Sequence, residues 1–226
     1  MSKYIVKFES DFRDYKSDSI AGGRNTKKFL EELSKNVFEQ SYKYFENYNN
    51  SIPLLLESES KSYSTFAAAI DKITPVHYSQ VADEVKGRFV DFWCNVQGRD
   101  YYIELKKAWC NIGFKSQGRF KNVGDVTNEL FRQLKSLKID PADFEKNAIG
   151  AVIISGYHHK NDKHKEEEKE NLYKYIIEEK QKWNLQTAVF TWYLPQDIKD
   201  SMDKDEYWEY IQEWVSIYYF VYSDKV

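Results

Sequence analysis

Two carboxylates and one ammonium lie within one short stretch of the sequence, at Asp91, Glu104 and Lys106. If Glu104 and Lys106 belong to one β-strand, their side chains share a face and lie about 6–7 Å apart along it. Apolar neighbours such as Phe92 and Ile103 make a carboxylate costly unless it is paired or binds a metal. Two acids together therefore favour a hard cation, and Mg²⁺ or Mn²⁺ is the expected cofactor. Lys106 could then orient or help deprotonate an attacking water, or stabilise charge on a phosphate.

The pattern around these residues predicts a β-hairpin that brings them together. Residues 88–96 and 101–106 are rich in the aromatic and β-branched side chains that strands favour. Residues 97–100, with Gly98, have the composition of a hairpin turn. Because paired strands lie about 5 Å apart, the hairpin would place both acids and the lysine at one pocket.

The other predicted elements alternate between helices and strands. Helical spacing of apolar residues predicts helices, and period-two or wholly apolar runs predict strands. The predicted helices are 25–48, 54–73, 125–138, one ending near 183 after a charged loop from 158 to 170, and 205–215; the predicted strands are 3–8, 80–86, 148–155, 187–194 and 218–222. A loop containing Gly113, Gly118 and Gly124 is expected before the helix 125–138.

The order helix, three strands, helix, strand over residues 54–155 predicts an α/β fold with a mixed sheet flanked by helices. The almost wholly apolar run 148–155 is typical of a strand buried on both faces of such a sheet. We expect 1–226 to form one domain, since its length suits one and only 9 Gly and 4 Pro interrupt it. The core would be extended by a helical N-terminal part, 1–53, and an α/β C-terminal part, 156–226.

Asp91, followed by Glu104-Leu105-Lys106, resembles the motif of the PD-(D/E)XK nuclease superfamily, which has the restriction-endonuclease-like fold. The core of that family has the element order predicted for residues 54–155, so the resemblance covers the middle of the chain. It implies that Asp91 and Glu104 bind the metal and that Lys106 assists the attack of water on phosphorus. One departure is Val90, which stands where many members have a proline.

The resemblance implies further site residues on two helices. An acid on the first core helix often joins the metal ligands in this family, and Glu59 is the expected one here, with Glu57 as the alternative. Many members also have a Gln or a basic residue on the helix after the lysine strand. Gln133 and Arg132 match this feature loosely and are the expected substrate-binding residues.

Glu-x-Lys triplets alone identify no site. They occur five times, beginning at Glu59, Glu84, Glu104, Glu167 and Glu178. The triplet at Glu104 is the one that combines an acid on the preceding strand, apolar flanks and a following amphipathic helix. Structural ion pairs within a mixed sheet remain the alternative interpretation.

Charge is distributed unevenly along the chain. The net charge is −3, which is unusual for a protein that coats nucleic acid non-specifically. However, residues 98–138 carry nine Lys or Arg against four acids, whereas 160–226 carry ten against fifteen. The basic stretch surrounds the candidate site and could bind a polyanion, with Lys107 among the expected phosphate contacts. Ordinary scatter of surface charges is the alternative.

Other features concern location and partners. No apolar run reaches the ~18 residues of a membrane span, so no membrane partner is expected. The first residues lack a signal peptide's apolar stretch, and Cys94 and Cys110 do not form a disulfide framework, so a cytoplasmic location is expected. Aromatic residues make up 17% and mostly suit a core; some rings could stack on bases, although composition does not identify them.

Three functional hypotheses follow. The leading one is a Mg²⁺-dependent nuclease that hydrolyses phosphodiester bonds of nucleic acid, with DNA expected although the residues do not distinguish it from RNA. The second is an inactive nuclease-like fold that acts as a binding or scaffold subunit of a larger complex. The third is a metal-dependent phosphohydrolase acting on small nucleotides. A homodimer is a reasonable expectation because nucleases of the similar family often dimerise to cut both strands.

Overall fold

The computed structural model describes residues 6–20, 22–47, 54–83, 88–113, 120–137, 146–160, 167–181, 183–204 and 209–222. Its α-helices are α1 (Gly23–Asn47), α2 (Leu54–Glu57), α3 (Glu59–Asp71), α4 (Lys121–Ser136), α5 (Glu167–Lys180) and α6 (Gln196–Lys204), and a 3₁₀ helix, η1 (Ser17–Ser19), precedes α1. Its strands are β1 (Phe8–Asp11), β2 (His77–Asp83), β3 (Arg88–Val96), β4 (Arg99–Asn111), β5 (Lys146–His159), β6 (Leu185–Tyr193) and β7 (Tyr210–Tyr222).

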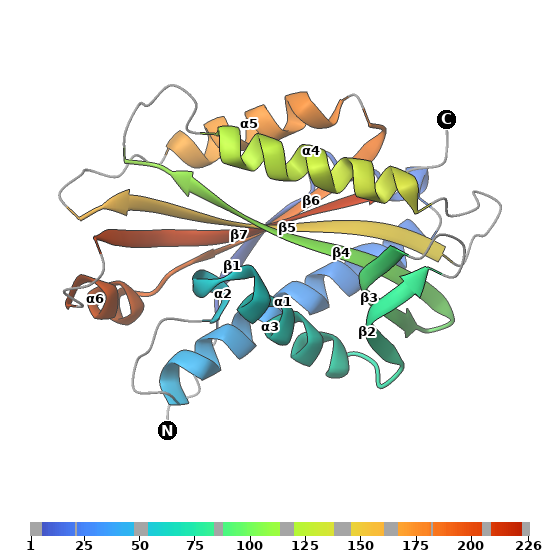
Figure 1. Cartoon of the computed structure of the whole chain (residues 1–226), viewed down its shortest axis with the longest axis horizontal. Helices are drawn as coiled ribbons and strands as arrows, with labels where there is room; N and C mark the ends of the chain where they lie inside the picture. Colours follow the sequence, from blue (N-terminus) through green and yellow to red (C-terminus); the bar gives the residue numbers. More distant parts are fainter. Residues whose placement is uncertain are drawn as a thin grey trace.

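The seven strands form one mixed sheet in the order β1-β6-β7-β5-β4-β3-β2. The central pair β4–β5 is parallel, whereas the other neighbouring strands are antiparallel. Helices α4 and α5 cover one face, and α1, α2 and α3 cover the other (Figure 1). The structure thus confirms the predicted α/β class with a mixed, helix-flanked sheet. The order α3, β2, β3, β4, α4, β5 also follows the predicted one, and β1, β6 and β7 extend the same sheet.

The central strand β5 is buried on both faces, as its apolar run predicts. Ile149 and Ile153 belong to the core beneath α1, whereas Val152 belongs to the core beneath α4 and α5. Gly150 lies under α4, where an added Cβ would be 2.6 Å from a methyl of Leu130. The missing side chain therefore lets α4 pack closely on the sheet beside β4.

The hairpin that holds the candidate residues has the predicted turn. Gln97 and Gly98 have φ values of 53° and 80°, the conformation of a two-residue type I′ turn that matches the twist of paired strands. Strand β4 is longer than the predicted 101–106, because it continues beside β5 from Asp100 to Asn111. The parallel partner thus supports β4 beyond the end of the hairpin.

The prediction of one helix over 54–73 is wrong, because Ser58 divides it into α2 and α3. Ser58 is extended, with φ −132° and ψ 164°, and its side-chain oxygen accepts a hydrogen bond from the backbone N–H of Lys61. This is the geometry of an N-cap, which satisfies one of the free N–H groups of a helix start. The cap makes Glu59 the first residue of α3.

The prediction of a helix at 205–215 is also wrong. Tyr210–Tyr222 form β7, a strand between β5 and β6, while residues 205–208 lie outside the described part of the chain. From Trp214 to Val221 every side chain of β7 is buried. A run buried on both faces has no period that separates strand from helix, and its aromatic and β-branched residues decide for strand.

Smaller differences concern element ends. The first strand is Phe8–Asp11 rather than 3–8, of which 3–5 lie outside the described residues. Helix α4 begins at Lys121 and includes Gly124, where the absent side chain leaves room for the hydroxyl of Tyr175 on α5. Cys94 and Cys110 are buried free thiols. In the described ranges, no helix combines the length and apolar character that crossing a membrane requires.

Candidate active site

Strands β3 and β4 separate part of the way along the hairpin. Their pairing runs from Val96–Arg99 to Phe92–Ile103 and then stops, while β3 remains paired with β2 as far as Arg88–Asp83. Beyond Ile103 the β4 edge that would face β3 is therefore open to side chains. We call this opening the β3–β4 fork.

Two acids bind the open edge of β4. The backbone N–H of Leu105 donates to Oδ2 of Asp91 at 2.7 Å, and that of Lys107 donates to Oε2 of Glu59 at 3.1 Å. Asp91 comes from β3 and Glu59 from the first turn of α3, so the fork gathers carboxylates from two elements. Hydrogen bonds from backbone N–H groups to a carboxylate are charge-assisted and fix its orientation.

Glu104 is the third acid of the fork. It is 6% exposed, and it would stand opposite Asp91 if the β3–β4 ladder continued. Burial raises the pKa of Glu104 to about 8; the charge of Asp91 and a hydrogen bond with it add to this, and the charge of Lys106 opposes it. Without a cation, the protonated Glu104 thus donates to Asp91, because two adjacent carboxylates resist joint ionisation.

Tyr63 bonds to Asp91 and lies close enough to Glu59 and Glu104 to feel their charges, and it was not among the residues predicted from the sequence. It lies one helical turn after Glu59 on α3, and its hydroxyl donates to the carboxylate of Asp91. Burial raises the pKa of this phenol, as do the Asp91 hydrogen bond and the charges of Asp91, Glu59 and Glu104. In the sequence Tyr63 occupies an ordinary apolar helix position, so spacing gives no sign of this contact.

Lys106 points toward α4. Its ammonium lies 3.6 Å from Oε1 of Glu129, with 18% of the lysine side chain exposed. Even-numbered residues share this face of β4, so Glu104 and Lys106 lie on one side, as predicted. Glu129 is exposed and a single ion pair with an exposed partner contributes little to stability, so Lys106 can exchange Glu129 for another anion.

The two residues predicted on α4 lie near Glu129 in sequence. Gln133 follows Glu129 by one turn, and its amide oxygen is buried without a hydrogen-bond partner within the described ranges. Arg132 is exposed and lines a shallow hollow of about 580 Å³ together with Asp125, Asn128 and Glu129. Gln133 is thus a polar group on the turn after the partner of Lys106, and Arg132 lies at the surface beside it.

Lys107 lies on the opposite face of β4 from Lys106. It is 8% exposed, its ammonium donates to the carbonyl of Leu55 at 2.7 Å, and it lies 4.6 Å from the ring centre of Trp109. In this place it ties α2 to β4 rather than facing the acids of the fork. The structure therefore gives Lys107 a positioning contact where the sequence predicts a phosphate contact. The side chain of Glu57, the alternative acid, lies outside the described part.

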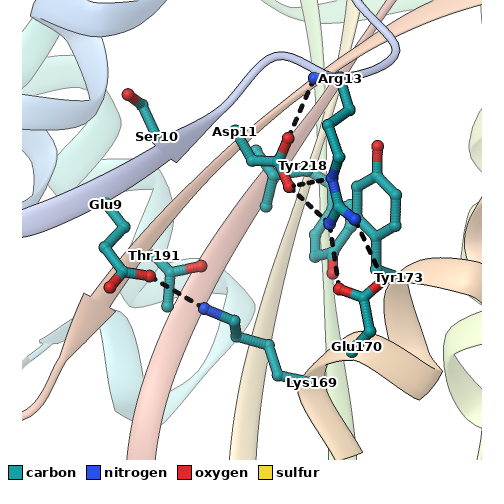
Figure 2. Close-up of a pocket in the computed structure, with 10 residues that line it drawn as sticks. Glu9, Ser10, Asp11, Arg13, Lys169, Glu170, Tyr173, Thr191 and Tyr218 are labelled. Atoms are coloured by element: carbon teal, nitrogen blue, oxygen red, sulfur yellow. Dashed lines mark hydrogen bonds and ion pairs between the residues drawn. The ribbon is translucent and has the colours of Figure 1, made fainter. Parts of the chain in front are cut away.

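A second group of charged residues lies between β1 and α5, around a pocket of about 390 Å³ (Figure 2). Arg13 donates to both oxygens of Glu170, at 3.0 and 3.1 Å, and to Asp11. Lys169 lies 3.1 Å from Glu9. The cations drawn in Figure 2 are thus paired with acids of the same pocket, which links β1 to α5 and leaves little free charge for a ligand.

Among the residues that the structure describes, no group of three or more His, Cys, Asp or Glu side chains is arranged to hold a metal ion. The acids of the fork are instead occupied by N–H groups, by Tyr63 and by each other. Mg²⁺ commonly binds proteins through one or two carboxylates and keeps several waters. Asp91 and Glu104 equal that number of carboxylates. Comparison with protein-family models, with curated proteins and with solved structures finds no match to the chain.

Proposed function

We propose that the chain is a Mg²⁺- or Mn²⁺-dependent nuclease with a restriction-endonuclease-like core over α3, β2, β3, β4, α4 and β5. The observation that carries the proposal is the β3–β4 fork, where Asp91 and Glu104 meet and Lys106 follows on the same face of β4. The element order and the parallel β4–β5 pair support the same assignment.

The donor set at the fork fits a hard divalent cation. Asp91 and Glu104 are close enough to share a proton, in a setting that opposes two negative charges. A cation that takes oxygen ligands would replace that proton and allow both to ionise. Asp91 and Glu104 would hold it, and Glu59, which lies at the N–H of Lys107 on the same strand edge, would bind one of its waters. The ion, when bound, polarises a phosphate oxygen and lowers the pKa of bound water.

The chain's own groups prepare the fork for this chemistry. The N–H of Leu105 and the hydroxyl of Tyr63 hold the Asp91 carboxylate in place. Lys106 leaves Glu129 and places its ammonium on the scissile phosphate or on the attacking water, where it stabilises negative charge. Gln133, one turn after Glu129 on α4, is the further group that would bind the substrate.

The test is cleavage of labelled oligonucleotides and plasmid in Mg²⁺ or Mn²⁺ by the wild type, Glu104→Gln and Lys106→Met. Both variants should lose activity while circular dichroism shows an unchanged fold. The matched controls are Glu178→Gln and Lys174→Met, which alter exposed residues of α5, the first of them within another Glu-x-Lys triplet. Wild-type cleavage that persists in Glu104→Gln would reject the assignment.

A second candidate function is binding without catalysis, as a subunit of a larger complex. It is favoured by the occupation of Asp91, Glu59 and Lys106 by other groups of the chain, which structural ion pairs would also show. Calorimetric titration with Mn²⁺ separates the two functions. The nuclease should bind Mn²⁺ with an affinity that falls in Glu104→Gln, whereas an inactive fold should show no carboxylate-dependent binding.

A further inference from the structure

A row of aromatic side chains crosses three neighbouring strands beside the fork. The sheet register pairs Tyr78 of β2 with Trp93 of β3, and Trp93 with Tyr102 of β4. The rings of Tyr78 and Trp93 stack with centroids 5.6 Å apart and an interplanar angle of 23°. Paired residues on neighbouring strands share a face. The three rings, here called the aromatic row, therefore lie on one face of the sheet.

The aromatic row adjoins the acids of the fork. Asp91 is two residues from Trp93 on β3, and Glu104 is two residues from Tyr102 on β4. Residues two apart on a strand share a face and are separated by about 6–7 Å. The acids thus belong to the next residue pair along the two strands, with the Asp91 carboxylate turned into the fork at the N–H of Leu105, and they lie near a nucleotide that neighbours one stacked on the rings.

Packing of the core does not account for the row. Tyr78 is 67% exposed and Val76, on the same edge of the sheet, is 49% exposed. Trp93 and Tyr102 are half-buried. By contrast, Phe92 on the opposite face of β3 is 2% exposed and packs against Phe66. At this end of the sheet the apolar core that contains Phe92 lies on that other face, so Tyr78 and part of Trp93 are accessible to solvent.

We propose that the aromatic row binds unpaired bases, so that the substrate of this site is single-stranded nucleic acid. The proposal rests on the proposed nuclease function. Bases of a single strand are free to stack on aromatic side chains, whereas those of a duplex are stacked within it. The net charge of −3 gives little non-specific attraction to duplex phosphates. Stacking supplies affinity that does not depend on a positive surface, and it places the nucleic-acid strand beside the fork.

The test is fluorescence anisotropy in EDTA, where binding is measured without cleavage. The probes are a labelled oligothymidine, an abasic oligomer of equal length and a blunt hairpin duplex. The wild type should bind the oligothymidine more tightly than either other probe. Tyr78→Ala should weaken that binding by about 5- to 150-fold, the range that corresponds to loss of one stacked base, and Tyr78→Phe should retain it. Tyr193→Ala, at an exposed tyrosine of β6, is the control.

Two results would overturn the proposal. The first is equal affinity for the abasic oligomer and the oligothymidine, and the second is unchanged oligothymidine binding by Tyr78→Ala, which would leave this face to a protein partner. Failure of the nuclease function can be distinguished from failure of the base-binding proposal. If the wild type binds oligothymidine through Tyr78 but does not cleave it in Mg²⁺, the base-binding role of the aromatic row stands and the nuclease function is rejected. If the Tyr78→Ala variant cleaves as well as the wild type, the nuclease function stands and the role of the aromatic row in binding bases is rejected.

Discussion

Asp91 and Leu105 are joined by a hydrogen bond in which the Leu105 backbone N–H donates to Oδ2 of the carboxylate at 2.7 Å. In an uninterrupted antiparallel ladder that N–H would bind a backbone carbonyl of the neighbouring strand. The side chain of Asp91 takes the place of the carbonyl because the pairing of β3 with β4 ends at Phe92. The separation of the strands thus both opens the fork and orients one of its acids.

Substitution of Lys106 is expected to affect mainly activity, and substitution of Lys107 mainly stability. Lys107→Met removes the hydrogen bond to Leu55 and leaves a buried carbonyl without its partner, which should lower the free energy of unfolding by about 1–3 kcal/mol. Lys106→Met removes an ion pair with an exposed glutamate and should cost less than about 1 kcal/mol. Its cleavage rate should nevertheless fall by about 100-fold or more. Urea unfolding and single-turnover cleavage of both variants measure the contrast, and a larger stability loss in Lys106→Met would contradict it.

Ser58→Ala should destabilise the protein by about 1 kcal/mol, because the alanine cannot accept the hydrogen bond from the N–H of Lys61. It should also weaken Mn²⁺ binding, since the cap holds the first turn that carries Glu59. Thermal unfolding and calorimetry measure the two effects. Ser64→Ala, which alters an exposed residue of the same helix, should change neither; equal effects from both serines would contradict the role of the cap.

Tyr63→Phe should weaken Mn²⁺ binding by about 10- to 100-fold, as the loss of a group that orients a metal ligand commonly does. The reason is that the Tyr63 hydroxyl donates to Asp91, while its ring packs 5.5 Å from that of Phe92. The variant therefore keeps the ring packing and loses only the hydrogen bond that orients the Asp91 carboxylate. Calorimetry measures the affinity, with Tyr222→Phe as the control. Unchanged Mn²⁺ affinity in Tyr63→Phe would show that the phenol does not position the acid.

The stability of the metal-free protein should decrease as the pH rises from about 5 to about 8 on account of Glu104. The pKa of Glu104 in the folded chain is about 8, above its ordinary value of 4.5. The folded state therefore holds this proton more tightly than the unfolded state does. The stabilisation from this proton is complete below the ordinary pKa of 4.5 and is lost as the pH rises through the folded-state pKa of about 8.

Urea unfolding in EDTA across this pH range measures the effect. Glu104→Gln cannot ionise and should show a flatter dependence, so that at pH 8 the variant is more stable than the wild type by about 1 kcal/mol or more. Added Mg²⁺ should restore stability to the wild type at pH 8 and have a smaller effect on the variant. Equal slopes in the two proteins would contradict the assignment of the buried proton to Glu104.

The sequence indicates the hairpin of the site because local signals decide it. Gly98 permits the tight turn, and the alternation around Glu104 and Lys106 gives those residues a common face. The β3–β4 fork could not be predicted, because the point at which β3 leaves β4 depends on β2 and α3, which are far from the turn. Tyr63 was missed for the same reason, since its contact with Asp91 forms only when α3 packs at the fork.

Two further differences between prediction and structure lie at β7 and at Ser58. The apolar side chains of β7 have a spacing that a helix also allows, and burial between β5 and β6 decides for strand. Ser58 is a favoured N-cap residue, but the apolar spacing that predicts the helix 54–73 begins at Tyr63 and does not mark where the helix starts. At β7 burial on both faces removes the periodicity that separates strand from helix, whereas at Ser58 a local hydrogen bond to the N–H of Lys61 divides the helix.

Anomalous diffraction from a crystal grown with Mn²⁺ tests the central claim most directly, since it locates the ion rather than its effects. We expect one anomalous peak in the fork, bound by Asp91 and Glu104, with Lys106 on the same side of the sheet. The peak should be absent from crystals of Asp91→Ala grown in the same way. A fork without a peak in the wild type, with the proton between Asp91 and Glu104 retained, would contradict the account.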